Sequence, residues 1–125
     1  MEANQSYRDK NYTNALNQIN KAIKIQENFS EELKKESKVE SAFYMRGITQ
    51  YVLQNYDQTI NDLNKVIEIN PKDSNAFLYK GMSQIILSSK NKDLLPLGCK
   101  NTKKAISLGN KNVSQTVKDI CSSIK

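Results

Sequence analysis

The sequence predicts an all-α fold: an α-solenoid of antiparallel helix hairpins, with about three repeated units, the first of them truncated, and a C-terminal capping helix. Three observations lead to this prediction. The 125 residues contain an internal repeat, apolar residues recur along them at helical spacing, and only four Gly and two Pro interrupt the pattern. Repeated units stack side by side because each buries its apolar face only against its neighbours. We therefore expect a single domain over 1–125.

Two internal similarities in the sequence give the length of the repeated unit. Residues 11–25 and 55–69 are identical at seven of fifteen positions, at an offset of 44 residues. Phe43 recurs as Phe77 at an offset of 34 residues. The two offsets together predict units of 34 residues and an insertion of ten residues between the first unit and the second.

The opening unit, about 1–27, and the insertion after it differ most from the others. We expect the unit's second helix over Tyr12–Ile25, with Ala15 as a small crossing residue, and a first helix that is cut short because the chain begins inside it. The insertion, about 28–39, is rich in charge. We predict lengthened helix ends there, around a polar turn near Asn28.

The central unit, 40–73, and the third unit, 74–109, each predict one helix pair. The second helix of the central unit carries an apolar stripe at helical spacing, formed by Ile60, Leu63 and Ile67. Pro71 ends that helix, and Asp73 or Ser74 caps the next one.

Two glycines and a terminal stripe complete the pattern. Gly47 and Gly81 lie inside predicted helices, where Gly costs about 1 kcal/mol relative to Ala, so their regular spacing indicates close helix–helix approach. The stretch 112–124 has an apolar stripe formed by Val113, Val117, Ile120 and Ile124. We predict that it is the capping helix that covers the last unit.

The central unit also carries a specific residue pattern. It has aromatic residues at Phe43 and Tyr56, small or branched residues at Gly47, Thr59 and Val66, and a terminal proline at Pro71. In these positions the chain resembles the tetratricopeptide repeat (TPR) family, and it is similar to bacterial TPR-domain proteins. The resemblance implies a curved stack whose concave wall is built from the first helix of each pair. It also implies a non-enzymatic protein–protein interaction scaffold that binds a peptide or partner helix in this groove.

On the family pattern, ten residues form or flank the groove. They are Tyr44, Arg46, Ile48, Tyr51, Val52, Asn75, Leu78, Lys80, Met82 and Ile85. Most are apolar, which is unusual for a solvated face, and the resemblance implies that Arg46 and Lys80 lie at the rim. Such a groove receives an amphipathic helix or an extended peptide. The alternative is that these residues pack against a neighbouring repeat.

Charge is distributed unevenly and gives an alternative function. Residues 1–62 carry eight basic and nine acidic side chains, whereas 63–125 carry eleven basic and four acidic ones. The alternative is electrostatic binding of nucleic acid or an anionic surface by the basic half. Its lysines alternate with apolar positions, and no aromatic platform accompanies them, so nucleic acid is the less favoured partner. The basic cluster comprises Lys90, Lys92, Lys100, Lys103 and Lys104.

Several residue types needed for catalysis are absent. The chain has no His, which excludes Ser–His and Cys–His catalysis and histidine metal sites, and its two Cys cannot form a four-thiolate zinc site. We expect no enzymatic activity, no cofactor and no metal. The longest apolar run is Ile85–Leu87, so we expect no membrane span. We expect a protein or peptide partner, and homo-oligomers would form at the apolar edge of the truncated first unit.

The two cysteines are placed symmetrically about a predicted turn. Cys99 and Cys121 each lie eleven residues from position 110, inside Gly109–Lys111. In an antiparallel helix pair they would lie at the same height, and a disulfide there would be worth roughly 3 kcal/mol. Two buried thiols are the alternative. The segment 98–110 resembles the close of bacterial repeat proteins, many of them exported. A reduced pair implies a cytoplasmic protein, and a bonded pair a periplasmic or exported one.

Overall fold

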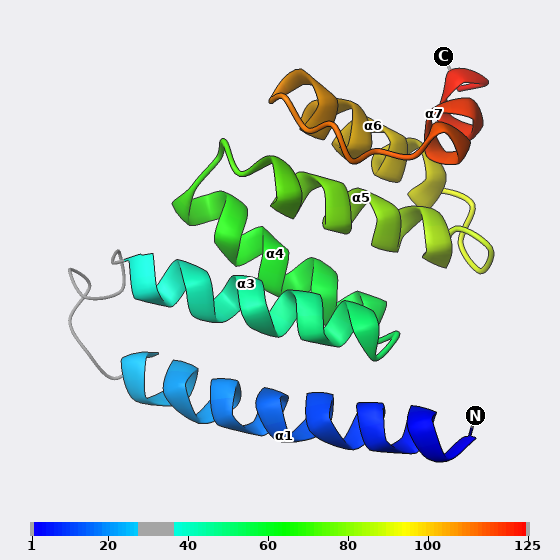
Figure 1. The fold of residues 1–125 in the computed structure, drawn as a ribbon. Helices are drawn as coiled ribbons and strands as arrows, with labels where there is room; N and C mark the ends of the chain where they lie inside the picture. Colours follow the sequence, from blue (N-terminus) through cyan, green and yellow to red (C-terminus); the bar gives the residue numbers. More distant parts are fainter. Residues whose placement is uncertain (1, 28–36, 125) are drawn as a thin grey trace.

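The computed structural model describes residues 2–27 and 37–124, and this part of the chain is helical, without strands. The helices are α1 (Glu2–Glu27), α3 (Ser37–Val52), α4 (Tyr56–Ile69), α5 (Ser74–Leu87), α6 (Leu94–Ser107) and α7 (Gln115–Ser122) (Figure 1). The predicted all-α class is therefore confirmed for the described residues. The predicted turn near Asn28 lies outside them.

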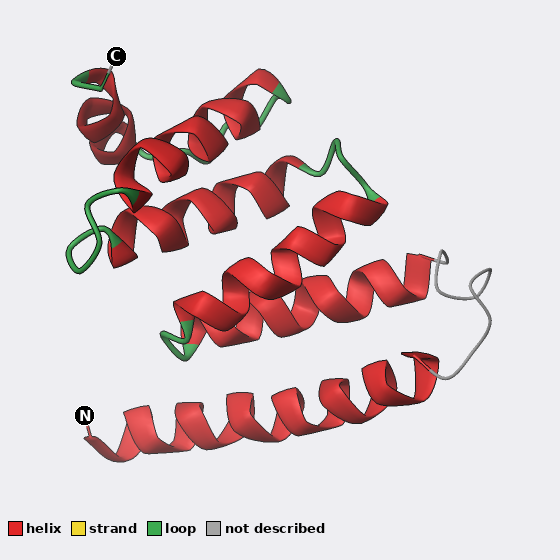
Figure 2. Ribbon diagram, turned by 180° about the vertical axis from the view of Figure 1, so that it is seen from behind, coloured by secondary structure: helices red, strands yellow, loops and turns green. Residues whose placement is uncertain are grey.

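The helices pack largely in chain order. α3 packs on α4, α4 on α5 and α5 on α6, while α1 lies on α3 and α7 contacts α6. α3 also touches α5 directly, so these two helices share one face of the molecule. Figure 2, seen from behind, shows the same succession from α1 at one end to α7 at the other. α3 and α4 overlap the predicted central unit 40–73, although α3 begins at Ser37, inside the predicted insertion, and α5 and α6 lie within the predicted third unit 74–109.

α1 corrects the prediction for the opening unit. A single helix runs through Glu2–Glu27, with no turn before Tyr12. In the central unit, the equivalent turn places Gln54 at a φ of 65°, an unfavourable value for a residue other than Gly. Packing of α4 on α3 offsets that cost. α1 contains no such turn and packs on α3 as one continuous helix.

The ends of the helices follow local sequence signals. The backbone N–H of Ala76 donates to Asp73 Oδ1 at 3.1 Å, so Asp73 rather than Ser74 caps α5. Ser114 caps α7 in the same way through the N–H of Val117. The predicted capping helix therefore begins at Gln115 and not at 112. Before it, the N–H of Asn112 donates to Asn110 Oδ1, a side-chain turn that competes with helix formation.

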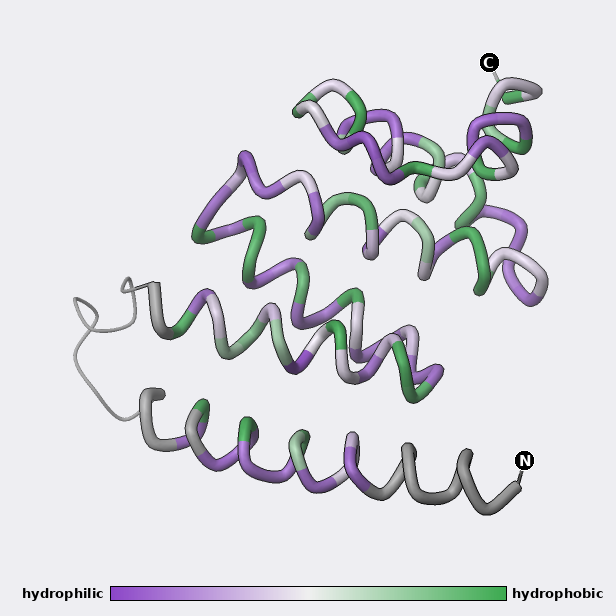
Figure 3. Tube along the Cα trace, in the orientation of Figure 1, coloured by the Kyte–Doolittle hydropathy of each residue, from purple (hydrophilic) through white to green (hydrophobic). Residues whose placement is uncertain are grey.

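The core consists of two clusters. The first is centred on Leu63 and Val66 of α4, both fully buried, and on Ala76 of α5. The second joins α5 and α6 to the C-terminal segment and contains Leu78, Cys99, Ala105, Val113, Val117 and Cys121. In the coloured parts of Figure 3, hydrophobic residues recur among polar ones along the helices, as expected for helices that bury one side.

Close contact between helices explains the repeated glycines. A Cβ atom on Gly81 would lie 2.7 Å from the carbonyl oxygen of Gly98, and a Cβ on Gly98 would lie 2.7 Å from that of Gly81. At Gly47 the nearest atom would be Leu63 Cδ2, at 3.2 Å. The predicted close approach at Gly47 and Gly81 is thus confirmed, and Gly98 is its unpredicted counterpart in α6.

The C-terminal segment covers the last helix pair by an unexpected path. After α6, residues 110–114 run back along that helix without forming a helix themselves, and α7 follows as a short element (Figure 1). Val113 and Val117 are buried as predicted. Ile120 is 39% exposed, and Cys121 takes the buried position instead.

Candidate functional site

The surface shared by α3 and α5 is the candidate site. At about 100° per residue, Tyr44, Ile48, Tyr51 and Val52 lie on one side of α3, and Asn75, Tyr79 and Ile86 lie on one side of α5. The two stripes meet, since the rings of Tyr51 and Tyr79 are 5.2 Å apart. We call these seven residues, together with the neighbouring Met45, the α3–α5 face.

Three tyrosines hold the centre of this face together. The ring of Tyr51 meets those of Tyr56 and Tyr79 edge to face, with centroids 5.5 and 5.2 Å away. Burial raises the pKa of Tyr51, and the neighbouring Tyr56 and Tyr79 raise it further. The pKa of Tyr44 is also raised, chiefly by burial and then by Asp73 and Tyr79. The raised pKa values favour the uncharged form of the Tyr44 and Tyr51 phenols, which suits a contact surface.

One end of the face has a hollow of about 380 Å³ at the N-terminal ends of α3 and α5. It is lined by Glu40, Ser41, Tyr44, Met45, Asp73 and Asn75. Met45 is 57% exposed, an unusual position for a large apolar side chain beside two carboxylates. An apolar side chain of a ligand would be covered by Met45 and Tyr44, while a basic group would meet Glu40 and Asp73.

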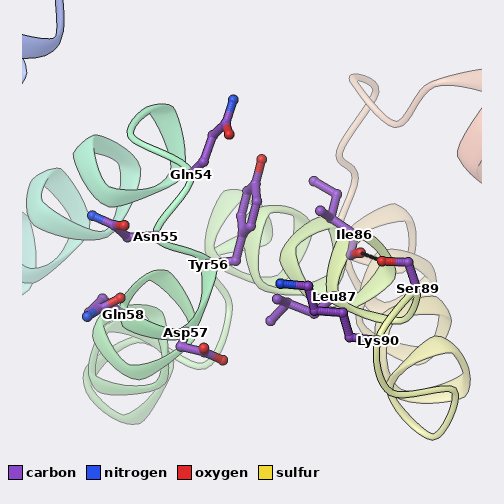
Figure 4. A pocket seen from close by; sticks show the side chains of 9 residues that line it. All are labelled: Gln54, Asn55, Tyr56, Asp57, Gln58, Ile86, Leu87, Ser89 and Lys90. Carbon is purple, nitrogen blue, oxygen red and sulfur yellow. Dashed lines mark hydrogen bonds between the residues drawn. The ribbon is translucent and has the colours of Figure 1, made fainter.

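The other end has a hollow of about 370 Å³ between the start of α4 and the end of α5 (Figure 4). It is lined by Gln54, Asn55, Tyr56, Asp57, Gln58, Ile86, Leu87, Ser89 and Lys90. In the close view the ring of Tyr56 stands between the amides of the α3–α4 turn and the side chains of Ile86 and Leu87. Ile86 is 40% exposed and continues the stripe of Tyr79 into this hollow.

Five of the ten predicted groove residues lie outside the α3–α5 face, and three of these five pack on the C-terminal core. Leu78 is only 4% exposed and lies in the C-terminal core, against which Met82 and Ile85 also pack. Leu78 and Ile85 project about 60–80° to one side of Asn75 around α5, toward α6 and the C-terminal segment. Leu78 and Ile85 are thus buried in internal packing, as the alternative to a groove role expected. Met82 lies only about 20° from Asn75 around α5 and borders the face, although it also packs on the C-terminal core. The sequence predicted a cap over the last unit, but not which side of α5 this cap would bury.

Arg46 is not a rim residue but a clamp between helices. Its Nε and Nη2 donate to Asp62 Oδ2 and Oδ1 at 2.8 and 2.6 Å, and its Nη1 donates to Asn20 Oδ1 at 2.6 Å. The guanidinium carbon also lies 5.4 Å from the centroid of the Phe43 ring. Arg46 thus ties α3 to both α4 and α1. Its partner Asp62 is buried, a pairing that the repeat pattern did not predict.

Lys80, the second predicted rim residue, is also absent from the face. It lies about 120° around α5 from the side that carries Tyr79 and Ile86. Half burial lowers the pKa of its ammonium group. Four residues of the candidate site were not predicted from the sequence: Met45, Tyr56, Tyr79 and Ile86. The exposure of Met45 and Ile86 depends on helix packing, so only the aromatic character of the two tyrosines was a usable signal.

Loss of the Arg46–Asp62 pair is expected to destabilise the protein measurably. Asp62→Asn leaves a partly buried guanidinium without its carboxylate, and we expect the free energy of unfolding to fall by about 2 kcal/mol, less than for a fully buried pair. Urea denaturation followed by circular dichroism measures this change. Glu68→Gln is the matched control, because the Lys65–Glu68 pair is exposed and should contribute under about 0.5 kcal/mol. Equal effects of both substitutions would contradict the clamp.

Cys99 and Cys121 lie at disulfide distance. Their Sγ atoms are 2.12 Å apart and their Cα atoms 5.3 Å apart. The predicted proximity is confirmed, although the chain reaches it through an extended segment and not through two antiparallel helices. Both residues are buried, so neither sulfur is placed to attack a substrate.

Comparisons with known proteins do not indicate a function for this chain. No protein-family model matches the chain, and no curated protein matches it at a significant level. Within residues 2–27 and 37–124, none of the helices is long and apolar enough to cross a bilayer. In the same ranges, no three His, Cys, Asp or Glu side chains come together to hold a metal ion.

Proposed function

We propose that this chain is a non-enzymatic interaction scaffold of the TPR type, an α-solenoid, whose α3–α5 face binds a peptide or a partner helix. The observation that carries the proposal is the exposure of Met45, Val52 and Ile86, at 57%, 37% and 40%, beside three clustered tyrosines. Tyr and Met are enriched in protein interfaces, where rigid aromatic rings give contact area at little entropic cost.

The size and rigidity of the face suit a short ligand. The sixteen residues of α3 span about 24 Å, the length of an extended peptide of seven or eight residues or of four helical turns. Packing among Tyr51, Tyr56 and Tyr79 fixes their rings before any ligand arrives. Binding to such a surface loses less side-chain entropy than binding to mobile side chains.

The test is selection of ligands followed by substitution at the face. Peptides from a random displayed library are selected against the whole chain, and their Kd values are measured for Met45→Glu and Ile86→Glu. A charge at either position should weaken the selected peptides by at least about tenfold. Leu97→Glu, at an equally exposed apolar position of α6, is the control and should change the Kd less than about threefold. Peptides that tolerate both face substitutions would contradict the proposal.

The cysteine pair supports an oxidising compartment. Disulfides persist in secreted and periplasmic proteins and are rare in the cytosol. We therefore favour the periplasmic or exported alternative over the cytoplasmic one. Mass measurement of the native protein under non-reducing conditions tests the bond: a mass lower than that of the reduced chain by two hydrogen atoms supports the disulfide, and the mass of the reduced chain contradicts it. Homo-oligomer formation at the truncated first unit stays a prediction.

A further inference from the structure

A second hollow, of different chemistry, lies between α5 and α6. Its volume is about 480 Å³, and it is lined by Phe77, Lys100, Asn101, Lys103, Lys104 and Ser107. Phe77 is half buried, packs on the C-terminal core and supplies the apolar part of the lining. The remaining lining comes from α6 alone. We call these six residues the basic hollow.

The lysines of the basic hollow are concentrated on one side of α6. Lys100, Lys103 and Lys104 follow i, i+3 and i+4 spacing, which places them next to one another within about 6 Å along the helix axis. Like charges at this spacing repel, and each pair costs a few tenths of a kcal/mol. Lys104 lies in the last turn of α6, where a cation interacts favourably with the helix dipole, so the helix tolerates this concentration of charge.

The protein itself does not neutralise these charges. Among the described residues, none of the three lysines forms an ion pair within 4.0 Å. Between residues 74 and 118 the sequence has a single acidic residue, Asp93, against eight lysines. The local potential is therefore strongly positive, and it attracts a ligand that brings negative charge.

The basic hollow is separate from the α3–α5 face. Phe77 projects about 160–180° around α5 from Asn75, Tyr79 and Ile86, on the opposite side of the helix. A ligand on the face would therefore not occupy the basic hollow. A binding site here is independent of the proposed function.

We propose that the basic hollow binds an acidic peptide segment of a partner protein. One apolar or aromatic side chain of the segment packs on Phe77, and flanking carboxylates pair with Lys100, Lys103 and Lys104. Asn101 and Ser107 lie at the edge, where the Asn101 amide donates to Gln84 Oε1 at 2.6 Å and the Ser107 hydroxyl donates to the Lys104 carbonyl oxygen at 2.7 Å. The second amide hydrogen of Asn101 can still donate to a ligand, and the Ser107 oxygen can accept. An apolar centre with a polar, charged rim is the usual anatomy of a protein–peptide contact.

The composition of the hollow favours a peptide over a nucleic acid. Sequence-tolerant binding of single strands uses several aromatic side chains in succession together with a positive groove that follows the backbone. Phe77 is the one aromatic residue in this lining, and the lysines span about one helical turn. Such a small footprint fits one anchor side chain and its neighbouring carboxylates.

The test uses a fluorescein-labelled peptide with one central phenylalanine between glutamates, and anisotropy titrations of the whole chain at low salt. The double substitution Lys103→Glu/Lys104→Glu should raise the Kd by at least about tenfold. Lys90→Glu/Lys92→Glu makes the same change of net charge in the α5–α6 loop and should raise the Kd less than about threefold.

Phe77→Ala should weaken binding as much as replacing the phenylalanine of the peptide by serine. If Phe77→Ala does not fold, Lys104→Gln takes its place in the test. Lys104 is exposed, and loss of its charge should also raise the Kd.

Three results would overturn the inference. The first is the absence of binding by the glutamate peptide at low salt. The second is an equal loss in both double variants, which would indicate attraction by net charge alone. The third is an oligothymidine that binds more tightly than the peptide and loses affinity in Lys103→Glu/Lys104→Glu, which would assign the hollow to nucleic acid instead. A matched peptide with glutamine in place of glutamate should bind at least about tenfold more weakly.

Discussion

Reduction of the Cys99–Cys121 pair is expected to lower the free energy of unfolding by about 3 kcal/mol and the melting temperature by about 10 °C. The two residues are 22 positions apart in the sequence, and a bond between them restricts the unfolded chain. The bond also fastens α7 to α6. Without it, α7 is held mainly by Val113 and Val117, so the C-terminal segment should be the first part to detach.

Urea denaturation of the wild-type protein with and without a thiol reductant measures this effect, since it needs no substitution in the core. Alkylation and mass measurement confirm reduction in each sample. The variant Cys99→Ala/Cys121→Ala serves as the control, because reductant should leave its unfolding midpoint unchanged. If the reductant also leaves the unfolding midpoint of the wild-type protein unchanged, the bond contributes nothing to stability.

Gly81→Ala is expected to destabilise the protein by about 3 kcal/mol, at the upper end of the cost of overpacking. The new Cβ would lie 2.7 Å from the Gly98 carbonyl oxygen and 2.9 Å from the Thr102 backbone nitrogen. These are backbone atoms, so only separation of α5 from α6 relieves the contact. The gain in helix propensity, about 1 kcal/mol, does not offset it.

Gly47→Ala is the matched comparison for Gly81→Ala. Its Cβ would meet the side chain of Leu63 at 3.2 Å, and a side chain can shift by a few tenths of an ångström where a backbone cannot. We expect its cost to stay below about 1 kcal/mol, because the gain in helix propensity nearly balances the tighter contact. Thermal melts of both variants, followed by circular dichroism, compare the two. Equal melting temperatures would show that helix contact does not explain these glycines.

The central part of the fold could be predicted because its signals are local or repeated. Apolar spacing placed α4 around Leu63, and the Asp73 cap and Pro71 marked the boundary between the two helix pairs. The spacing of the glycines also predicted close contact correctly. Each of these features depends on residues within a few turns of one another, or on a pattern that occurs twice.

The candidate site was less predictable because it depends on how distant segments fold onto one another. Leu78 was predicted as a groove residue from its position in α5, but α6 and the C-terminal segment together bury it. Arg46 is directed away from the rim by Asp62 and Asn20, which lie 16 and 26 positions away in the sequence. The continuity of α1 through Tyr12 was likewise not predicted, because the repeated pattern of residues 11–25 indicated that a helix starts there.

The buried carboxylate of Asp62 restricts how α3 and α4 can align. Apolar stripes tolerate a slip of one helical turn, about 5.4 Å, because one branched side chain replaces another. The same slip would carry Asp62 away from Arg46 and leave a desolvated charge unpaired, at a cost of several kcal/mol. Ionic pairing thus selects a single register between the two helices. In this register Tyr56 of α4 meets Tyr51 of α3 edge to face, so a charged pair outside the α3–α5 face helps to set the geometry of its aromatic contacts.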